Sequence, residues 1–110
     1  IGGWNAPHFS TDFTSNQWFD ALHKWNTKVV AQPSEGFDGF DGFDYDIEGN
    51  DDYLSKFSHF TVKELNLMGE LAVLLKKNGY LVTMAPAQSY FDVDENNFEI
   101  AALHLNGSGY

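Results

Sequence analysis

The stretch that decides the fold covers residues 40–49 and reads FDGFDYDIEG. Its acids Asp44, Asp46 and Glu48 occupy alternate positions. Because successive side chains of a β-strand point to opposite faces, this spacing predicts a strand with all three carboxylates on one face, about 6–7 Å apart from one to the next. The residues that alternate with the acids are apolar or aromatic: Phe43, Tyr45 and Ile47. Acids in a row are costly to bury unless they share protons and hydrogen bonds, so the row indicates a functional use.

The composition narrows the classes of function that this chain can serve. Its 110 residues suffice for one domain with a core, and the formal net charge is −10, with sixteen acids against six basic residues. Such a charge argues against nucleic acid as a partner, because nucleic-acid binding needs basic patches. The absence of cysteine excludes disulfides and Cys metal sites. No apolar run reaches about 18 residues, so we expect no membrane insertion.

The residues on either side of the acid row predict alternating strands and helices. Residues 1–5 are typical of a strand end, and the acid strand itself is expected over 40–48. A helix is predicted near 16–32, since apolar residues recur there at helical spacing and form one stripe. The members of this stripe, of which the two Trp are expected in the core, are Trp18, Leu22, Trp25 and Val29.

A second helix is predicted near 61–78, followed by a strand over 80–85. Thr61 and Glu64 have the spacing of a capping box at the start of this helix, and Gly79 is a typical terminating glycine. Pro86 ends the strand, and residues 92–110 form a tail that we leave unassigned. Strands alternating with helices predict an α/β fold with a parallel sheet.

Three strands and two helices cannot cover both faces of a parallel sheet. We therefore expect a partial (β/α)8 TIM barrel, and we expect residues 1–110 to be a fragment of one catalytic domain whose remaining barrel lies outside this chain. Active sites of such barrels lie at the carboxyl ends of the strands. This places Glu48 at the barrel mouth, with Asp46 and Asp44 successively deeper.

Three short motifs carry a resemblance to a known family. Residues 41–48, DGFDYDIE, fit the Asp-x-x-Asp-x-Asp-x-Glu signature of glycoside hydrolase family 18, the chitinases and their relatives. Residues 1–5, IGGWN, resemble the Ser-x-Gly-Gly motif of that family's third barrel strand, and residues 83–86, TMAP, resemble the end of its fifth strand. The resemblance implies that the chain covers roughly strands 3 to 5 with the two intervening helices.

The resemblance also implies a reaction. Members of this family are substrate-assisted exceptions to the two-carboxylate rule for glycosidases. The N-acetyl oxygen of the substrate would attack the anomeric carbon, Asp46 would orient the acetamido group, and Glu48 would protonate the leaving sugar. Repulsion from Asp46 would raise the pKa of Glu48, and Asp44 would share a proton with Asp46. Chitin or a chitooligosaccharide would be cleaved with retention of configuration, without metal or cofactor, by a secreted, extracellular enzyme.

Further residues are expected to support substrate binding. Asp41 lies at the start of the acid strand, and Met84 and Gln88 lie near the end of the strand predicted over 80–85. Trp4, directly after a strand end, can stack on a sugar ring. The family's Tyr and Trp from later strands lie outside this chain, so we expect the 110 residues alone to be inactive.

Other interpretations of the same residues remain open. A non-catalytic lectin that binds N-acetylglucosamine oligomers, an endo-β-N-acetylglucosaminidase acting on N-glycans and a structural subunit of a larger assembly are the alternatives. A calcium loop of EF-hand type is disfavoured, because its last position, where a bidentate Glu is required, falls on Ser55. The four His are scattered without metal-ligand spacing, so no metal site is predicted.

Overall fold

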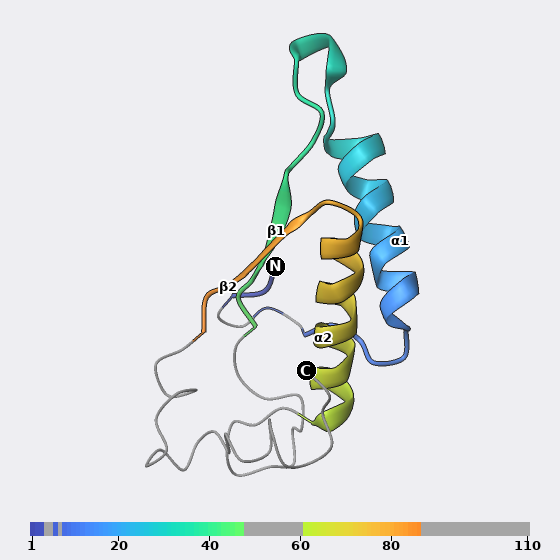
Figure 1. Ribbon diagram of the computed structural model, residues 1–110, viewed down its shortest axis with the longest axis vertical. Coiled ribbons are helices and arrows are strands. Elements are labelled where there is room, and N and C mark those ends of the chain that lie inside the picture. Colours follow the sequence, from blue (N-terminus) through green and yellow to red (C-terminus); the bar gives the residue numbers. More distant parts are fainter. Residues whose placement is uncertain (4–5, 7, 48–60, 87–110) are drawn as a thin grey trace.

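The computed structural model describes residues 1–3, 6, 8–47 and 61–86. The elements in these ranges are α1 (Ser15–Trp25), a π-helical turn η1 (Asn26–Val30), a 3-10 turn η2 (Pro33–Glu35), β1 (Gly42–Tyr45), α2 (Val62–Lys77) and β2 (Leu81–Met84). Figure 1 shows α1 and α2 side by side, on the same side of the two strands.

The strands are parallel and adjacent. In the register of β1 and β2, Asp44 lies opposite Thr83 and Tyr45 lies opposite Met84. Residues 1–3 run along the other edge of β1, where Gly2 forms a parallel bridge with Asp46. The Asp46 N–H donates to the Ile1 carbonyl at 2.8 Å. The spatial order is therefore residues 1–3, β1 and β2, which is also their order along the chain.

Local signals in the sequence explain where the helices begin and end. Thr14 and Gln17 form a capping box at the start of α1, and the Thr61 hydroxyl accepts the Glu64 N–H at 3.2 Å at the start of α2. After α2, Gly79 has a φ of 87°. The Tyr80 N–H donates back to the Leu75 carbonyl at 3.0 Å, which completes a Schellman motif.

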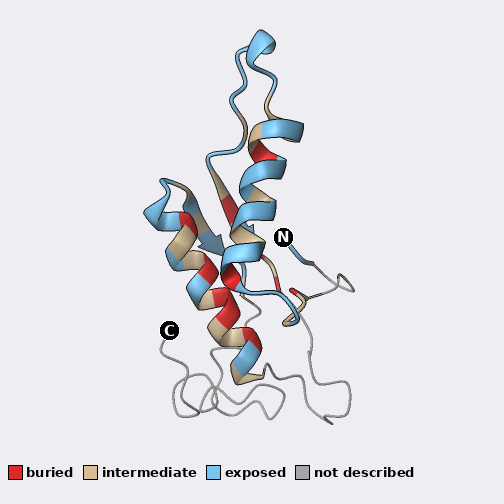
Figure 2. Cartoon of the chain, turned by 90° about the vertical axis from the view of Figure 1, so that its right-hand side faces the viewer, coloured by how far each residue is buried: buried red, intermediate tan, exposed pale blue. Residues whose placement is uncertain are grey.

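The core lies between the helices and one face of the sheet. Alternate residues of the acid strand enter it, and α2 supplies most of the remainder, as the buried stripe in Figure 2 shows. The buried apolar residues are Phe9, Phe43, Tyr45, Ile47, Leu67, Met68, Leu71 and Leu75. No described helix covers the opposite face of the sheet, and Asp44 on that face is exposed.

The first helix differs from the prediction in its second half. Regular α-helix ends at Trp25 and continues as a π-helical turn. Trp25 is 44% exposed, so the prediction that it lies in the core was wrong; Val29, further along the same stripe, is 69% exposed. The reason is geometric: Asn26, directly after α1, contacts Phe40, so the end of this helix lies beside residues that precede β1.

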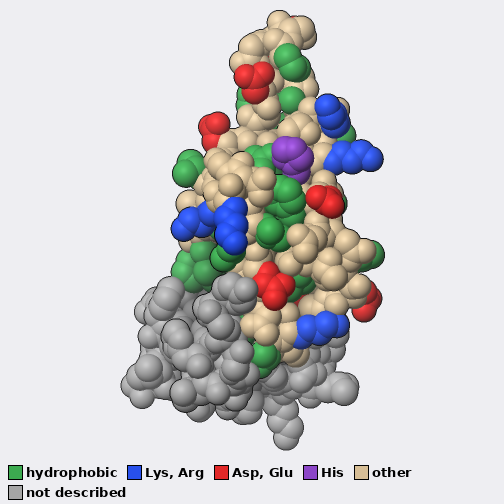
Figure 3. All heavy atoms as spheres, turned by 45° about the vertical axis from the view of Figure 1, so that its right-hand side comes forward, with side chains coloured by type: hydrophobic (Ala, Val, Ile, Leu, Met, Phe, Trp, Pro, Cys, Tyr) green, Lys and Arg blue, Asp and Glu red, His purple; other side chains and the backbone are tan. Residues whose placement is uncertain are grey.

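The surface of the helical side carries dispersed charge. In Figure 3 the Lys side chains lie at separate places among acidic, polar and apolar residues, and they form no continuous basic surface on the face shown. Among the described helices, none is both long enough and apolar enough to cross a membrane.

Candidate active site

Two acids of the row lie on the face of the sheet that no described helix covers. Asp44 is exposed and Asp46 is partly buried, whereas Phe43, Tyr45 and Ile47 between them are buried on the side of the helices. Burial of these three apolar side chains fixes which face the acids occupy, since a shift of one residue would exchange the faces. The alternation of the sequence therefore places Asp44 and Asp46 together on the face opposite the helices.

Asp44 has a hydroxyl partner on the neighbouring strand. The Thr83 Oγ1 donates a hydrogen bond of 2.5 Å to the Asp44 Oδ1. The pairing follows from the register, which sets the two residues directly opposite each other on parallel strands. A hydroxyl bonded to a carboxylate makes a short, strong hydrogen bond, so it restricts the rotation of the Asp44 carboxyl group.

Asp46 lies beside two glycines from the edge segment. Gly2 and Gly3 have φ values of 102° and 109°, which non-glycine residues rarely adopt. A Cβ on Gly2 would lie 2.1 Å from the Asp46 carbonyl oxygen, and a Cβ on Gly3 would lie 3.6 Å from Asp46 Oδ2. Glycine at position 2 thus permits the close approach of the two backbones, and at position 3 it leaves the Asp46 carboxylate without a neighbouring side chain there.

The register places Met84 differently from the sequence expectation. Met84 pairs with Tyr45, so its side chain shares the helix-covered side of the sheet and not the side of Asp44. Thr83 is therefore the β2 residue opposite Asp44, and the role of Met84 in substrate binding stays a prediction. Thr83 could not be singled out from the sequence, because its contact with Asp44 depends on the exact pairing of two strands far apart in the chain.

Asp41 lies at the other end of the strand from the expected mouth. It is exposed, and its carbonyl accepts the Leu81 N–H at 2.9 Å, which extends the pairing of β1 and β2 by one residue. It lies five positions before Asp46, a distance of about 16 Å along the strand. Asp41 is therefore separate from the pair formed by Asp44 and Asp46.

Three of the predicted site residues, Glu48, Trp4 and Gln88, lie outside the described residues. The placement of the proton donor therefore stays a prediction from the alternation of the sequence.

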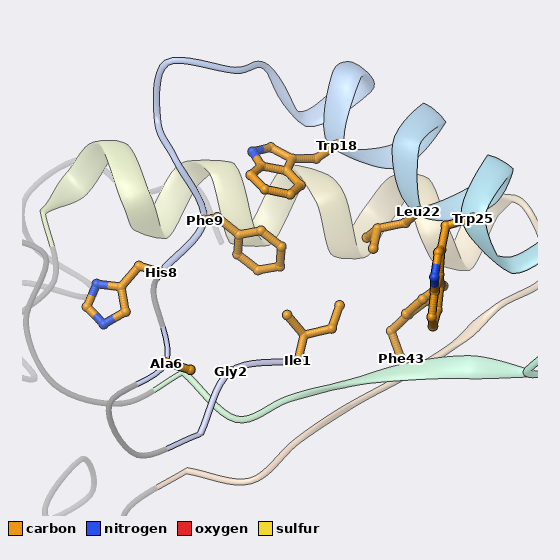
Figure 4. A pocket seen from close by; sticks show the side chains of 9 residues that line it. All are labelled: Ile1, Gly2, Ala6, His8, Phe9, Trp18, Leu22, Trp25 and Phe43. Atoms are coloured by element: carbon orange, nitrogen blue, oxygen red, sulfur yellow. The ribbon is translucent and has the colours of Figure 1, made fainter. Parts of the chain in front are cut away.

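An apolar cavity lies on the opposite side of the sheet from Asp44 and Asp46. Its volume is about 370 Å³, and Figure 4 shows side chains from α1, β1 and the N-terminal segment pointing toward one another across it. The lining residues are Ile1, Gly2, Ala6, His8, Phe9, Trp18, Leu22, Trp25 and Phe43. No carboxylate lines the cavity, so it belongs to the packing of the helices and is separate from the acid face.

The described residues offer no group of three or more His, Asp or Glu side chains arranged to hold a metal ion. The acid face presents a pair of carboxylates. The Asp44 carboxylate accepts a hydrogen bond from the Thr83 hydroxyl, and the Asp46 carboxylate lies beside Gly3, which has no side chain. Carboxylates two residues apart on a strand can share protons and hold a polar group of a ligand. Comparisons with protein-family models, with curated proteins and with solved structures found no match.

Proposed function

We propose that the acid face belongs to the active site of a chitinase-type glycoside hydrolase, built on a (β/α)8 barrel of which this chain supplies part. The observation that carries the proposal is the separation of the two faces of β1. Asp44 and Asp46 lie on the face that no described helix covers, while their apolar neighbours are buried beneath the helices. In a (β/α)8 barrel the corresponding face of each strand points into the interior, where side chains from several strands converge and can act on one substrate.

The roles proposed for the acids follow from their order along the strand. Glu48 donates a proton to the leaving glycosidic oxygen, and Asp46 orients the substrate acetamido group. Asp44 lies behind Asp46 and exchanges a proton with it, so that Asp46 can turn toward the substrate. The N-acetyl oxygen of the substrate is the nucleophile, which makes a second catalytic carboxylate unnecessary. The Gly2-Gly3 edge supports this scheme, since it leaves space beside Asp46 Oδ2.

The substrate-assisted step predicts which substrates are cleaved and with which stereochemistry. We expect the full-length protein to hydrolyse chitooligosaccharides and to release fresh product as the β-anomer, detected by proton NMR before mutarotation. The matched control is the deacetylated oligomer of equal length, which lacks the N-acetyl oxygen and should not be cleaved.

An α-anomer as the first product, or equal cleavage of the deacetylated oligomer, would contradict the mechanism. Binding of chitooligosaccharide without turnover would favour the lectin alternative. Release of N-glycans in place of chitooligosaccharide cleavage would favour the endo-β-N-acetylglucosaminidase alternative.

A further inference from the structure

We infer that Thr83 is a positioning residue for the acid row, which holds Asp44 in the orientation needed to exchange a proton with Asp46. This inference rests on the proposed function. Its structural basis is the bond from Thr83 Oγ1 to Asp44 Oδ1, 2.5 Å long, between residues that lie 39 positions apart in the sequence. The register of β1 and β2 sets the two residues opposite each other, so the contact follows from the sheet itself.

The bond distinguishes the two oxygens of Asp44. Thr83 donates its hydroxyl proton to Oδ1, which occupies that oxygen as an acceptor. The other oxygen, Oδ2, can then hold the proton that Asp44 shares with Asp46. Asp46 lies two positions further along the same face of the strand. Without the hydroxyl, the carboxyl group rotates more freely, since the terminal torsion of Asp is broad. Thr83 thus fixes the orientation of the Asp44 carboxyl group, with Oδ1 bound to the hydroxyl and Oδ2 left for the shared proton.

Nothing in this arrangement requires Thr83 to touch the substrate. In the order of the row, Asp44 lies behind Asp46, and Thr83 is beside Asp44. Loss of the hydroxyl should therefore lower kcat and leave KM nearly unchanged. It should also alter the pH dependence of kcat, because the proton shared by the two aspartates is held differently.

Two variants separate the hydroxyl from the shape of the side chain. Thr83→Val keeps the branched shape and the strand preference but removes the hydroxyl. Thr83→Ser keeps the hydroxyl. In the full-length protein with a chitooligosaccharide, we expect Thr83→Val to lower kcat about tenfold, the order expected from one hydrogen bond to a charged group, and to shift the acid side of the pH–rate profile. Thr83→Ser should keep both close to wild type.

A kcat and pH profile of Thr83→Val equal to wild type would overturn the inference. An equal loss in Thr83→Val and Thr83→Ser would also overturn it, because the hydroxyl would then not be the cause.

A second readout does not depend on catalysis. The carboxyl carbon-13 resonance of Asp44 should move in Thr83→Val and stay in place in Thr83→Ser. A resonance unmoved by Thr83→Val would refute the pairing of Thr83 with Asp44, even in an active enzyme. If wild type hydrolyses no chitooligosaccharide, the proposed function fails and the resonance alone decides whether Thr83 positions Asp44.

Discussion

At the residue scale, Tyr45 combines burial with an unpaired hydroxyl. Its side chain is 4% exposed, and its Oη has no hydrogen-bond partner among the residues that the structure describes. Burial raises the pKa of the Tyr45 phenol well above its ordinary value near 10, because the phenolate would lose its hydration. In the folded protein the group therefore stays neutral over a wider pH range than in the unfolded chain.

The sign of the pH dependence follows from this difference. Above pH 10 the unfolded chain loses the Tyr45 proton while the folded protein keeps it, so the free energy of unfolding falls as the pH rises. The loss reaches up to about 1.4 kcal/mol per pH unit from this group. We expect Tyr45→Phe to remove that component of the alkaline slope, measured by urea unfolding between pH 8 and 11.

At pH 7 the same variant should be as stable as wild type or more stable, since it removes a buried hydroxyl that has no partner in the described part of the chain. An alkaline slope identical in wild type and Tyr45→Phe would show that the phenol is accessible to water in the folded protein.

At the element scale, Asn26 joins the end of α1 to the chain before β1. It is 2% exposed; its Nδ2 donates to the Phe40 carbonyl at 2.9 Å, and its Oδ1 accepts the Phe40 N–H at 2.8 Å. Gly39 makes the contact possible, because a Cβ there would lie 2.9 Å from Asn26 Oδ1. The Asn26 side chain thus binds both backbone groups of Phe40, as a neighbouring strand would.

Removal of this amide should be costly. We expect Asn26→Ala to lower the free energy of unfolding by about 2–3 kcal/mol, because both backbone groups of Phe40 lose their partner. The matched control is Asn16→Ala, an exposed position in the first turn of α1, which should change stability by no more than about 0.5 kcal/mol. Equal effects of the two substitutions in denaturant unfolding would contradict the assigned role of Asn26.

The elements also separate what local sequence can predict from what it cannot. The alternation of acids and apolar residues predicts a strand with two unlike faces, and the structure has it in β1 and its continuation. The helix starts are encoded within four residues, as Thr14 with Gln17 and Thr61 with Glu64 show. Signals of this length lie within one short segment of the sequence, so they can be recognised without knowledge of the fold.

Contacts between distant segments lie beyond such reasoning. Whether Thr83 or Met84 shares the face of Asp44 depends on the register of two strands, and a shift by one residue would exchange them. The exposure of Trp25 depends on where the end of α1 lies relative to the sheet, for which its helical stripe carries no signal. The Asn26 contact with Phe40 is likewise set by tertiary packing.

At the scale of the whole molecule, the two faces of the sheet have different surroundings. The helices and the core occupy one side of β1, and the acids occupy the opposite side. The apolar cavity of Figure 4 lies on the helical side, so the proposed chemistry and the packing of the helices do not compete for the same space. Substitutions on the acid face should therefore change activity with little effect on stability.

The most direct test of the central claim is the kcat of Glu48→Gln in the full-length protein on a chitooligosaccharide. Loss of a general acid predicts a fall of at least about 100-fold with binding retained. The control is Asp38→Asn, an equivalent acid-to-amide change at an exposed residue before β1, which should leave kcat unchanged. Turnover by Glu48→Gln at the wild-type rate would contradict the assignment of the acid row as the catalytic site.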